Sequence, residues 1–304
     1  MPVQTEWVLL RSNIPFLLRI WRLEDMKRIL TIQDISCFGK CSITIALPVI
    51  SAMGVEGVIL PTALFSTHTL FPDYKKISLS EQRMAFAEQW KNNGIRFDAI
   101  YTGYLGSIEE IDTVLSLVDM FRDENTLVFV DPVMGDNGKL YRGFDEEYVI
   151  RNRKLCECSD IIVPNLTEAC MLTGTKYRND RDEAYYAALC GRLCDMGAKT
   201  AVLTGASLSE GKTGVFGMRA SDRETFSYQN DKVAASYHGT GDLFASTAAA
   251  AMVRGIAMSD AFRIASDYTA ETIRATMSNP DHPWYGVDFE STLPMLIGMA
   301  AKYL

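Results

Sequence analysis

Short apolar runs recur along the chain and alternate with longer stretches in which apolar residues return every three or four positions. The runs predicted as strands are residues 27–32, 55–60, 97–102, 126–130, 161–163 and 200–203. The stretches predicted as helices are residues 43–53, 180–196, 240–254, 259–277 and 289–303. Alternation of buried strands with helices is typical of an α/β protein with a parallel sheet.

Two weaker patterns add detail to this outline. Residues 212–216 and 224–228 alternate apolar and polar positions around the polar turn 221–223, which predicts an antiparallel hairpin at the edge of the sheet. Ser78-x-x-Glu81 has the spacing of a capping box, so a helix is expected to begin there and to end before Gly94.

Residues 1–25 have a different character from the rest of the chain. Their apolar runs at 7–10 and 16–18 are interrupted by arginine, asparagine and proline, so neither a secretory leader nor a membrane-spanning helix is expected. Met26 leads directly into the first predicted strand. We therefore expect residues 1–25 to be an extension outside the fold and residues 26–304 to form a single domain.

Composition narrows the partners and the compartment. The chain is 48% hydrophobic with a net charge of −8 and has no cluster of lysine and arginine, which argues against binding nucleic acid. Seven cysteines, an odd number, suggest free thiols in a reducing, cytoplasmic setting. Zinc is disfavoured at Cys156-x-Cys158 and at Cys190 and Cys194, because neither spacing is that of a zinc knuckle and the second pair fits a buried helix face.

The most informative stretch is residues 237–246, where a glycine-rich loop opens into a helix. Gly239 and Gly241 leave backbone amides accessible, Thr240 adds a hydroxyl, and the helix start contributes partial positive charge, which together suit a phosphate group. Asp242 in the first turn fits two roles. It either caps the helix or accepts a proton from a hydroxyl that attacks the bound phosphate.

Further polar residues follow the predicted central strands. Asp131 comes directly after strand 126–130, and Asn165 and Glu168 follow strand 161–163 on one helical turn. Carboxylates at the carboxyl edge of a parallel sheet are well placed to reach a hydrated Mg²⁺ ion. The alternatives are a turn rich in Asp, Asn and Gly at 131–138 and an ordinary helix cap at Asn165.

The Gly-x-Gly-Asp run at 239–242 resembles the signature of the ribokinase-like kinases, and its Leu-Phe-Ala continuation resembles the pyridoxal kinase branch. The resemblance is strongest over residues 131–141 and extends from Met26 to about Met277. It implies a three-layer α/β/α sandwich with a mostly parallel sheet. It also implies transfer of the γ-phosphoryl group of ATP to the 5′-hydroxymethyl group of pyridoxal, pyridoxine or pyridoxamine.

The same resemblance assigns roles to individual residues. The residues that it places near ATP are Asp131, Asp136, Tyr141, Asn165, Glu168, Thr204, Val233, Gly239, Thr240 and Gly241. The residues that it places near the vitamin are Asp34, Ser36, His68, Thr69, Tyr104 and Asp242. By this resemblance, Asp131 and Glu168 hold Mg²⁺ through water. The resemblance also implies a homodimer, and it leaves open whether a monovalent cation is needed.

One position departs from the family pattern. Asp34 stands where pyridoxal kinases carry a serine that contacts the vitamin ring, and Ser36 is a candidate to compensate; both also fit the capping of a turn. His68 and Thr69 are also explained as ordinary loop residues, and Tyr104 and Val233 as residues of the core. Three other functions stay open: a hydroxymethylpyrimidine kinase, whose family generally has cysteine at the position of Asp242; a sugar kinase, whose β-lid is not found between residues 34 and 60; and a non-catalytic vitamer-binding protein.

Overall fold

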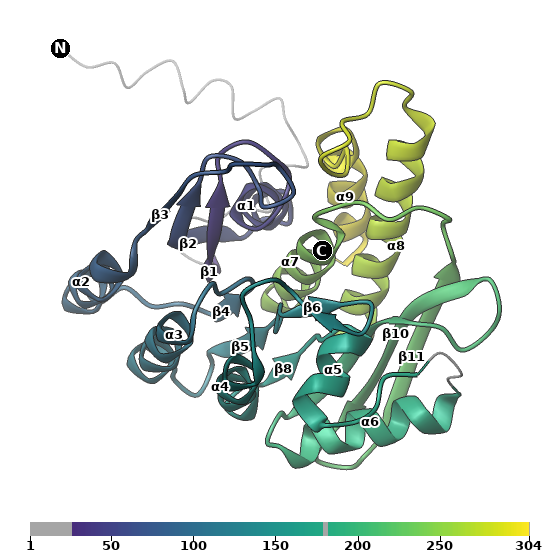
Figure 1. Cartoon of the computed structure of the whole chain (residues 1–304), viewed down its shortest axis with the longest axis horizontal. Coiled ribbons are helices and arrows are strands. Elements are labelled where there is room, and N and C mark those ends of the chain that lie inside the picture. The colour runs from purple at the N-terminus through teal and green to yellow at the C-terminus, as the bar shows by residue number, and fades with distance from the viewer. Residues whose placement is uncertain (1–25, 179–181, 304) are drawn as a thin grey trace.

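The computed structural model describes residues 26–178 and 182–303; the predicted extension, 1–25, lies outside this part. Within it, nine strands form one sheet in the order β11-β10-β9-β8-β5-β4-β1-β2-β3 (Figure 1). In chain order these strands are β1 (Arg28–Ser36), β2 (Glu56–Phe65), β3 (Lys76–Ser78), β4 (Ala99–Thr102), β5 (Leu127–Val130), β8 (Ile161–Ile162), β9 (Thr200–Ala206), β10 (Lys212–Arg219) and β11 (Thr225–Asp231).

The centre of the sheet is parallel and both edges are antiparallel. Parallel pairing runs from β2 through β1, β4, β5 and β8 to β9. The β10–β11 hairpin continues the sheet beyond β9 in antiparallel pairing, which confirms the predicted hairpin. β3 pairs antiparallel with β2 at the other edge, and the sequence does not predict it because its three residues are all exposed.

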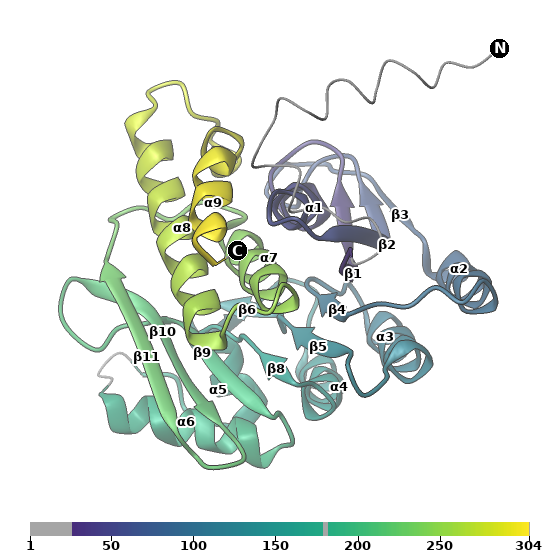
Figure 2. The same ribbon diagram turned by 180° about the vertical axis from the view of Figure 1, so that it is seen from behind.

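Helices cover both faces of the sheet (Figures 1 and 2). One face packs against α2 (Ser80–Asn92), α3 (Ile108–Phe121), α4 (Glu146–Glu157), α5 (Leu166–Thr173) and α6 (Glu183–Asp195). The other packs against α1 (Ile43–Ala52), α7 (Thr240–Val253), α8 (Met258–Ser278) and α9 (Leu293–Ala300). Successive strand residues alternate between these layers, with Leu30 in the first core and Ile29 in the second. The predicted α/β/α sandwich is confirmed.

Two predicted helices differ from the observed ones, and the predicted start of a third lies outside the described residues. The capping box at Ser78 is wrong, because Ser78 pairs with Ala63 in the sheet and α2 begins at Ser80 without a side-chain cap. The predicted helix 289–303 is divided into the 3₁₀ turn η4 (Glu290–Thr292), α9 and the 3₁₀ turn η5 (Ala301–Tyr303). α6 begins after its cap Asp182, and the predicted start at residue 180 falls within 179–181, outside the described residues.

Three of the four cysteines considered as zinc ligands, Cys156, Cys190 and Cys194, are buried in the described structure, and Cys158 is partly buried. Cys190 and Cys194 are buried on α6, and their thiols donate to the carbonyl oxygens of Phe216 and Met218 at 3.7 and 3.6 Å. Cys156 is buried in the core as well. Within residues 26–178 and 182–303, no helix combines the length and the apolar run that crossing a membrane requires.

The topology fixes where a ligand can bind. The chain leaves β1 toward β2 at one edge, and from β4 onward the parallel strands are added in the opposite direction through β5, β8 and β9. The strand order reverses between β1 and β4, and open α/β sheets bind ligands outside the carboxyl ends of the strands near such a point. α7 lies against this region, and its alanines at 248–251 are fully buried, as their small size predicted.

Candidate active site

A cavity of about 450 Å³ lies at the carboxyl ends of β5, β8 and β9, beside the start of α7. Nine of the ten residues predicted near ATP line it: Asp131, Asp136, Tyr141, Asn165, Glu168, Thr204, Val233, Thr240 and Gly241. Gly239, the tenth, lies directly before them at the cap of α7. Residues more than a hundred positions apart in the sequence therefore meet around one space.

The predicted loop-to-helix transition is observed, and Gly239 is required there. Gly239 is buried with a φ of 86°, and a Cβ atom on it would lie 2.3 Å from the carbonyl oxygen of Lys40. A residue with a Cβ atom therefore does not fit at this position. Gly241 has open space where its Cβ would be, and the cavity reaches it and Thr240. The first amides of α7 thus border the cavity, where the helix dipole favours an anion.

Asp242 occupies the first turn of α7 and is partly buried. Burial, together with the nearby charge of Asp34, raises its pKa to about 7, although a hydrogen bond from the backbone amide of Ser42 opposes the shift. A carboxyl group with a pKa near neutrality is suited to exchanging a proton with a bound hydroxyl group.

Two buried acids line the cavity: Asp131, directly after β5, is 8% exposed, and Glu168, in the first turn of α5, is 2% exposed. Burial raises the pKa of Glu168 to about 7, even though backbone amides at 134, 135 and 165 stabilise its charged form. Burial and the charges of Glu168 and Asp242 raise the pKa of Asp131 well above its usual range. The charges of Glu168 and Asp242 therefore oppose the ionisation of Asp131, and a cation would relieve this cost.

Glu168 and Asn165 form the capping box of α5. The carboxylate of Glu168 accepts from the amide of Asn165 at 2.8 Å, and the side chain of Asn165 accepts from the amide of Glu168 at 3.0 Å. The other carboxylate oxygen of Glu168 accepts from the amide of Met134 at 3.0 Å, which ties the loop after β5 to α5. The predicted cap is present, and the same contacts aim both residues at the cavity.

The remaining nucleotide candidates come from three different elements. Asp136 and Tyr141 are exposed on the small hairpin of β6 (Gly135–Asp136) and β7 (Lys139–Leu140). Thr204 lies on β9, where its amide donates to the carbonyl oxygen of Pro164 at 3.0 Å. Val233 follows β11 and is half-buried. These residues form the outer wall of the cavity.

The predicted vitamin-binding residues lie beside this cavity but do not line it. Asp34 is 5% exposed at the end of β1, and its two carboxylate oxygens accept hydrogen bonds from Ser42 Oγ at 2.6 Å and Ser36 Oγ at 3.1 Å. Burial raises its pKa despite these two bonds. Tyr104, half-buried after β4, has a pKa raised to about 12 by burial and by the charge of Asp34. Thr69 is exposed at the tip of the loop after β2.

His68 is engaged within the protein through both ring nitrogens. Its Nδ1 accepts from the amide of Leu70 at 3.2 Å, so the proton is on Nε2, which donates to the carbonyl oxygen of Tyr285 at 2.9 Å. The ring is 1% exposed and lies 4.5 Å from the ring of His238. In this arrangement His68 fixes the loop, and its ring nitrogens are not available to a ligand.

Several residues at or beside the cavity are not predicted from the sequence. Ser42 has a φ of 51°, and it donates through its hydroxyl to Asp34 and through its amide to Asp242. Asn230, Ser266 and Thr269 line the cavity, and each has a buried oxygen without a hydrogen-bond partner in the described structure. In the sequence these four look like ordinary loop, strand or helix positions, and only the strand-edge position of Asn230 hints at a polar role.

The fold and the arrangement of this site define a ribokinase-like protein. The model of the phosphomethylpyrimidine kinase family matches residues 34–283, and the chain belongs to this family. The pyridoxal kinase of Arabidopsis thaliana is 30% identical over 227 residues, which cover 72% of each chain.

Solved structures agree with this assignment. A phosphomethylpyrimidine kinase-like protein of Bacteroides thetaiotaomicron, crystallised with pyridoxal, superposes with a TM-score of 0.84 at 33% identity, covering 89% of this chain and 96% of the other. The pyridoxal kinase of Lactobacillus plantarum superposes with a TM-score of 0.82 at 28% identity, covering 91% and 99%.

Proposed function

We propose that this protein is a pyridoxal kinase, which transfers the γ-phosphoryl group of ATP to the 5′-hydroxymethyl group of pyridoxal, pyridoxine or pyridoxamine. The observation that carries the proposal is that the buried acids Asp131 and Glu168 line one cavity together with Thr240 and Gly241 of the α7 turn, and that Asp242 follows directly in the same turn, beside this cavity. Relatives named pyridoxal kinase, and a related structure that contains pyridoxal, support the choice of acceptor.

Asp242 is the proton acceptor of the proposed reaction. Its pKa of about 7 allows it to be ionised at physiological pH and still to take a proton as the acceptor hydroxyl attacks. The amides of Thr240 and Gly241 and the dipole of α7 stabilise negative charge on the phosphoryl group in transit. These two tasks fall to neighbouring residues, so the attacking oxygen and the phosphoryl group are brought to the same helix end.

The acidic residues fit a magnesium ion that is held through water. Both carboxylate oxygens of Glu168 are already bonded to amides, and the described residues hold no cluster of three or more His, Cys, Asp or Glu that could coordinate a metal directly. Mg²⁺ retains its waters and takes the rest of its ligands from phosphates, so Asp131 and Glu168 would orient those waters. The ion would supply positive charge to the phosphates.

On the vitamin side, we propose that Asp34, Ser36, Tyr104 and Thr69 surround the ring of the acceptor. Asp34 lies near enough to Asp242 to raise the pKa of that residue, which supports one continuous acceptor and phosphate site. Tyr104 is tilted against Phe144 with ring centroids 5.7 Å apart, and it offers an aromatic surface for a flat ligand. His68 serves by holding the adjacent loop.

A coupled assay of ADP release separates the candidate functions. We expect turnover with pyridoxal, pyridoxine or pyridoxamine that depends on Mg²⁺ and exceeds turnover with hydroxymethylpyrimidine or ribose. Preference for hydroxymethylpyrimidine would instead assign the activity that gives the matching family its name. Binding of a vitamer by calorimetry without ADP release would indicate a non-catalytic binding protein.

The proposal includes the setting in which the enzyme works. A cytoplasmic location is supported by buried thiols such as those of Cys156 and Cys190, and a homodimer follows from the family resemblance. Light scattering of the purified protein measures the second point directly.

Residues 1–25 are proposed to be dispensable, with 26–304 as the kinase domain. β1 begins at Arg28, whose amide donates to Asp98 at 2.8 Å, and the ion pair between Lys27 and Asp98 ties down the residue before it. A chain that starts at Met26 should therefore keep its melting temperature and its kcat/KM. Loss of soluble protein or of activity on this deletion would contradict the proposal.

A further inference from the structure

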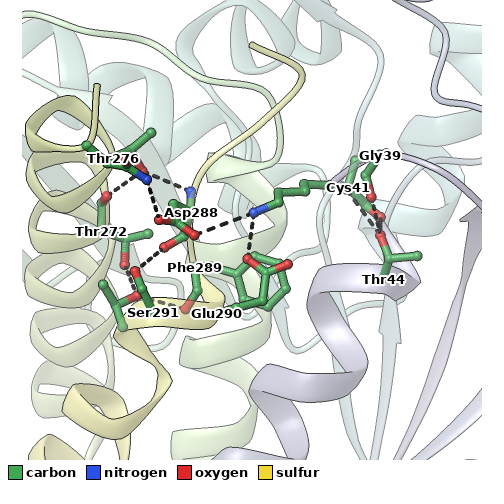
Figure 3. Close-up of polar contacts among 12 residues, drawn as sticks. Gly39, Cys41, Thr44, Thr272, Thr276, Asp288, Phe289, Glu290 and Ser291 are labelled. Carbon is green, nitrogen blue, oxygen red and sulfur yellow. Dashed lines mark hydrogen bonds and ion pairs between the residues drawn. The ribbon is translucent and has the colours of Figure 1, made fainter. Parts of the chain in front are cut away.

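Lys40 joins the loop after β1 to the segment between α8 and α9. Its ammonium group lies 2.6 Å from Glu290 Oε2 and 3.7 Å from Asp288 Oδ1, with only 13% of the side chain exposed. It also lies 5.6 Å from the centre of the Phe289 ring. Figure 3 shows Asp288 and Glu290 facing the loop that contains Gly39 and Cys41. A lysine shielded in this way between two carboxylates is held more firmly than an exposed ion pair.

The acidic side of this contact is itself fixed by α8. The amide of Asp288 donates to Thr276 Oγ at 2.9 Å, and the hydroxyl of Thr276 donates to the carbonyl oxygen of Thr272 at 2.8 Å (Figure 3). Phe289 is 3% exposed and anchors the segment in the core. Asp288 and Glu290 therefore present their charges from a rigid position.

The same segment touches the loop after β1 at further points. A Cβ atom on Gly286 would lie 2.6 Å from the Cβ of Lys40, so the backbone at 286 rests directly on the lysine side chain. The rings of Phe38 and Tyr285 lie 4.9 Å apart. The carbonyl oxygen of Tyr285 accepts the hydrogen bond from His68, whose ring in turn covers Gly39.

Lys40 is also in contact with the proposed catalytic turn. Its carbonyl oxygen occupies the space that a Cβ of Gly239 would need. Two residues further on, Ser42 adopts a φ of 51°, which is costly for a residue other than glycine, and there it bonds both Asp34 and Asp242. Strain of this kind persists only when surrounding contacts hold the backbone in place.

We propose that residues 284–290 form a C-terminal clasp on Lys40 that holds the 39–42 loop and so sets the positions of Asp34 and Asp242. Lys40 is then a positioning residue for the reaction proposed above, on which this inference rests. It acts from outside the nucleotide cavity, through Ser42 and the Gly239 turn. The loop contacts Asp34 and Asp242 directly through Ser42, and it meets the nucleotide side only through Gly239, so the clasp is expected to affect use of the acceptor more than binding of ATP.

The variant Lys40→Met removes the charge and keeps the length of the side chain. We expect kcat/KM for the acceptor to fall by about tenfold or more, because small misplacements of catalytic groups are costly, while KM for ATP stays within about twofold. Lys40→Arg should restore most of the loss. The double variant Lys40→Met/Glu290→Gln should be no worse than Lys40→Met, as expected for residues that act through one contact. Lys27→Met is the matched control, since it breaks a lysine–aspartate pair of 2.8 Å at the opposite end of β1.

Amide hydrogen exchange of the free protein tests the clasp without relying on activity. Residues 39–44 and 240–243 should exchange several-fold faster in Lys40→Met than in the wild type or Lys27→Met, while β5 stays unchanged. Equal exchange in Lys40→Met and Lys27→Met overturns the clasp. Faster exchange with unchanged kcat/KM overturns the positioning role. If the wild type phosphorylates no acceptor, the proposed function fails and the exchange result alone decides the clasp.

Discussion

Asp242→Asn is expected to lower kcat by about 10²-fold or more, with KM for ATP nearly unchanged, because the amide cannot accept the proton of the acceptor hydroxyl. The substitution keeps the size of the side chain and leaves the Gly239–Gly241 amides in place. Steady-state kinetics with saturating Mg²⁺ and varied ATP and pyridoxal measure both parameters. Nearly unchanged turnover would refute the assigned role.

The pH dependence provides a second measurement on the same residue. Since the pKa of Asp242 is raised to about 7, kcat/KM of the wild type should fall as the pH drops below about 7, and this limb should be absent from the residual activity of Asp242→Asn.

A rise in pH through about 7 is expected to increase activity but to lower the contribution of Asp242 to folding stability. In the unfolded chain Asp242 has its ordinary pKa of 3.8, so the folded protein binds the proton more tightly than the unfolded chain does. The resulting contribution to the free energy of unfolding is complete below about pH 4 and is lost as the pH rises through about 7. At pH 8 the Asn variant should therefore melt no lower than the wild type. That comparison separates loss of chemistry from loss of fold.

Removal of Mg²⁺ by a chelator is expected to lower turnover by about 10³-fold, because the charge of the phosphates is then left to the protein alone. Asp131→Asn should raise the Mg²⁺ concentration for half-maximal activity by about tenfold or more, as is typical for residues that hold a metal through its waters. Titration of activity with Mg²⁺ at fixed ATP measures this shift.

The control for Asp131→Asn is Asp112→Asn, on the exposed surface of α3, where the carboxylate pairs with Arg151 at 3.3 Å. It should leave the Mg²⁺ dependence unchanged. Burial and two neighbouring charges raise the pKa of Asp131, so the neutral Asn variant should not be less stable than the wild type at neutral pH. An unchanged Mg²⁺ requirement in Asp131→Asn would remove this residue from the metal site.

The elements of the fold were predictable because their patterns are local. The predicted strand 126–130 is apolar from Leu127 onward, as is typical of a strand buried on both faces, and β5 occupies 127–130. The start at Ser78 failed for a non-local reason, since the backbone there is taken by pairing with Ala63 of β2. Local capping signals cannot register a partner strand that lies fifteen residues away.

The residues of the site likewise fall into those that a local pattern predicts and those that depend on distant segments. Strand ends and the glycine turn could be located because parallel strands deliver their carboxyl ends to one edge. The conformation of Ser42, the tautomer of His68 and the partners of Lys40 could not be located, because each depends on backbone or side-chain atoms of a distant segment. Tyr285 illustrates this limit, since it contributes a carbonyl oxygen and the identity of its side chain gives no sign of that.

The two edges of the sheet bear on how the protein behaves at high concentration. β3 is only three residues long and includes Lys76, which makes it a poor template for strand addition. β11 is longer, but α8 packs beside it and Asp267 receives hydrogen bonds from Tyr228 and Asn230. A sheet this wide would otherwise invite fibrillar aggregation, and its borders instead discourage neighbouring molecules from joining strand to strand.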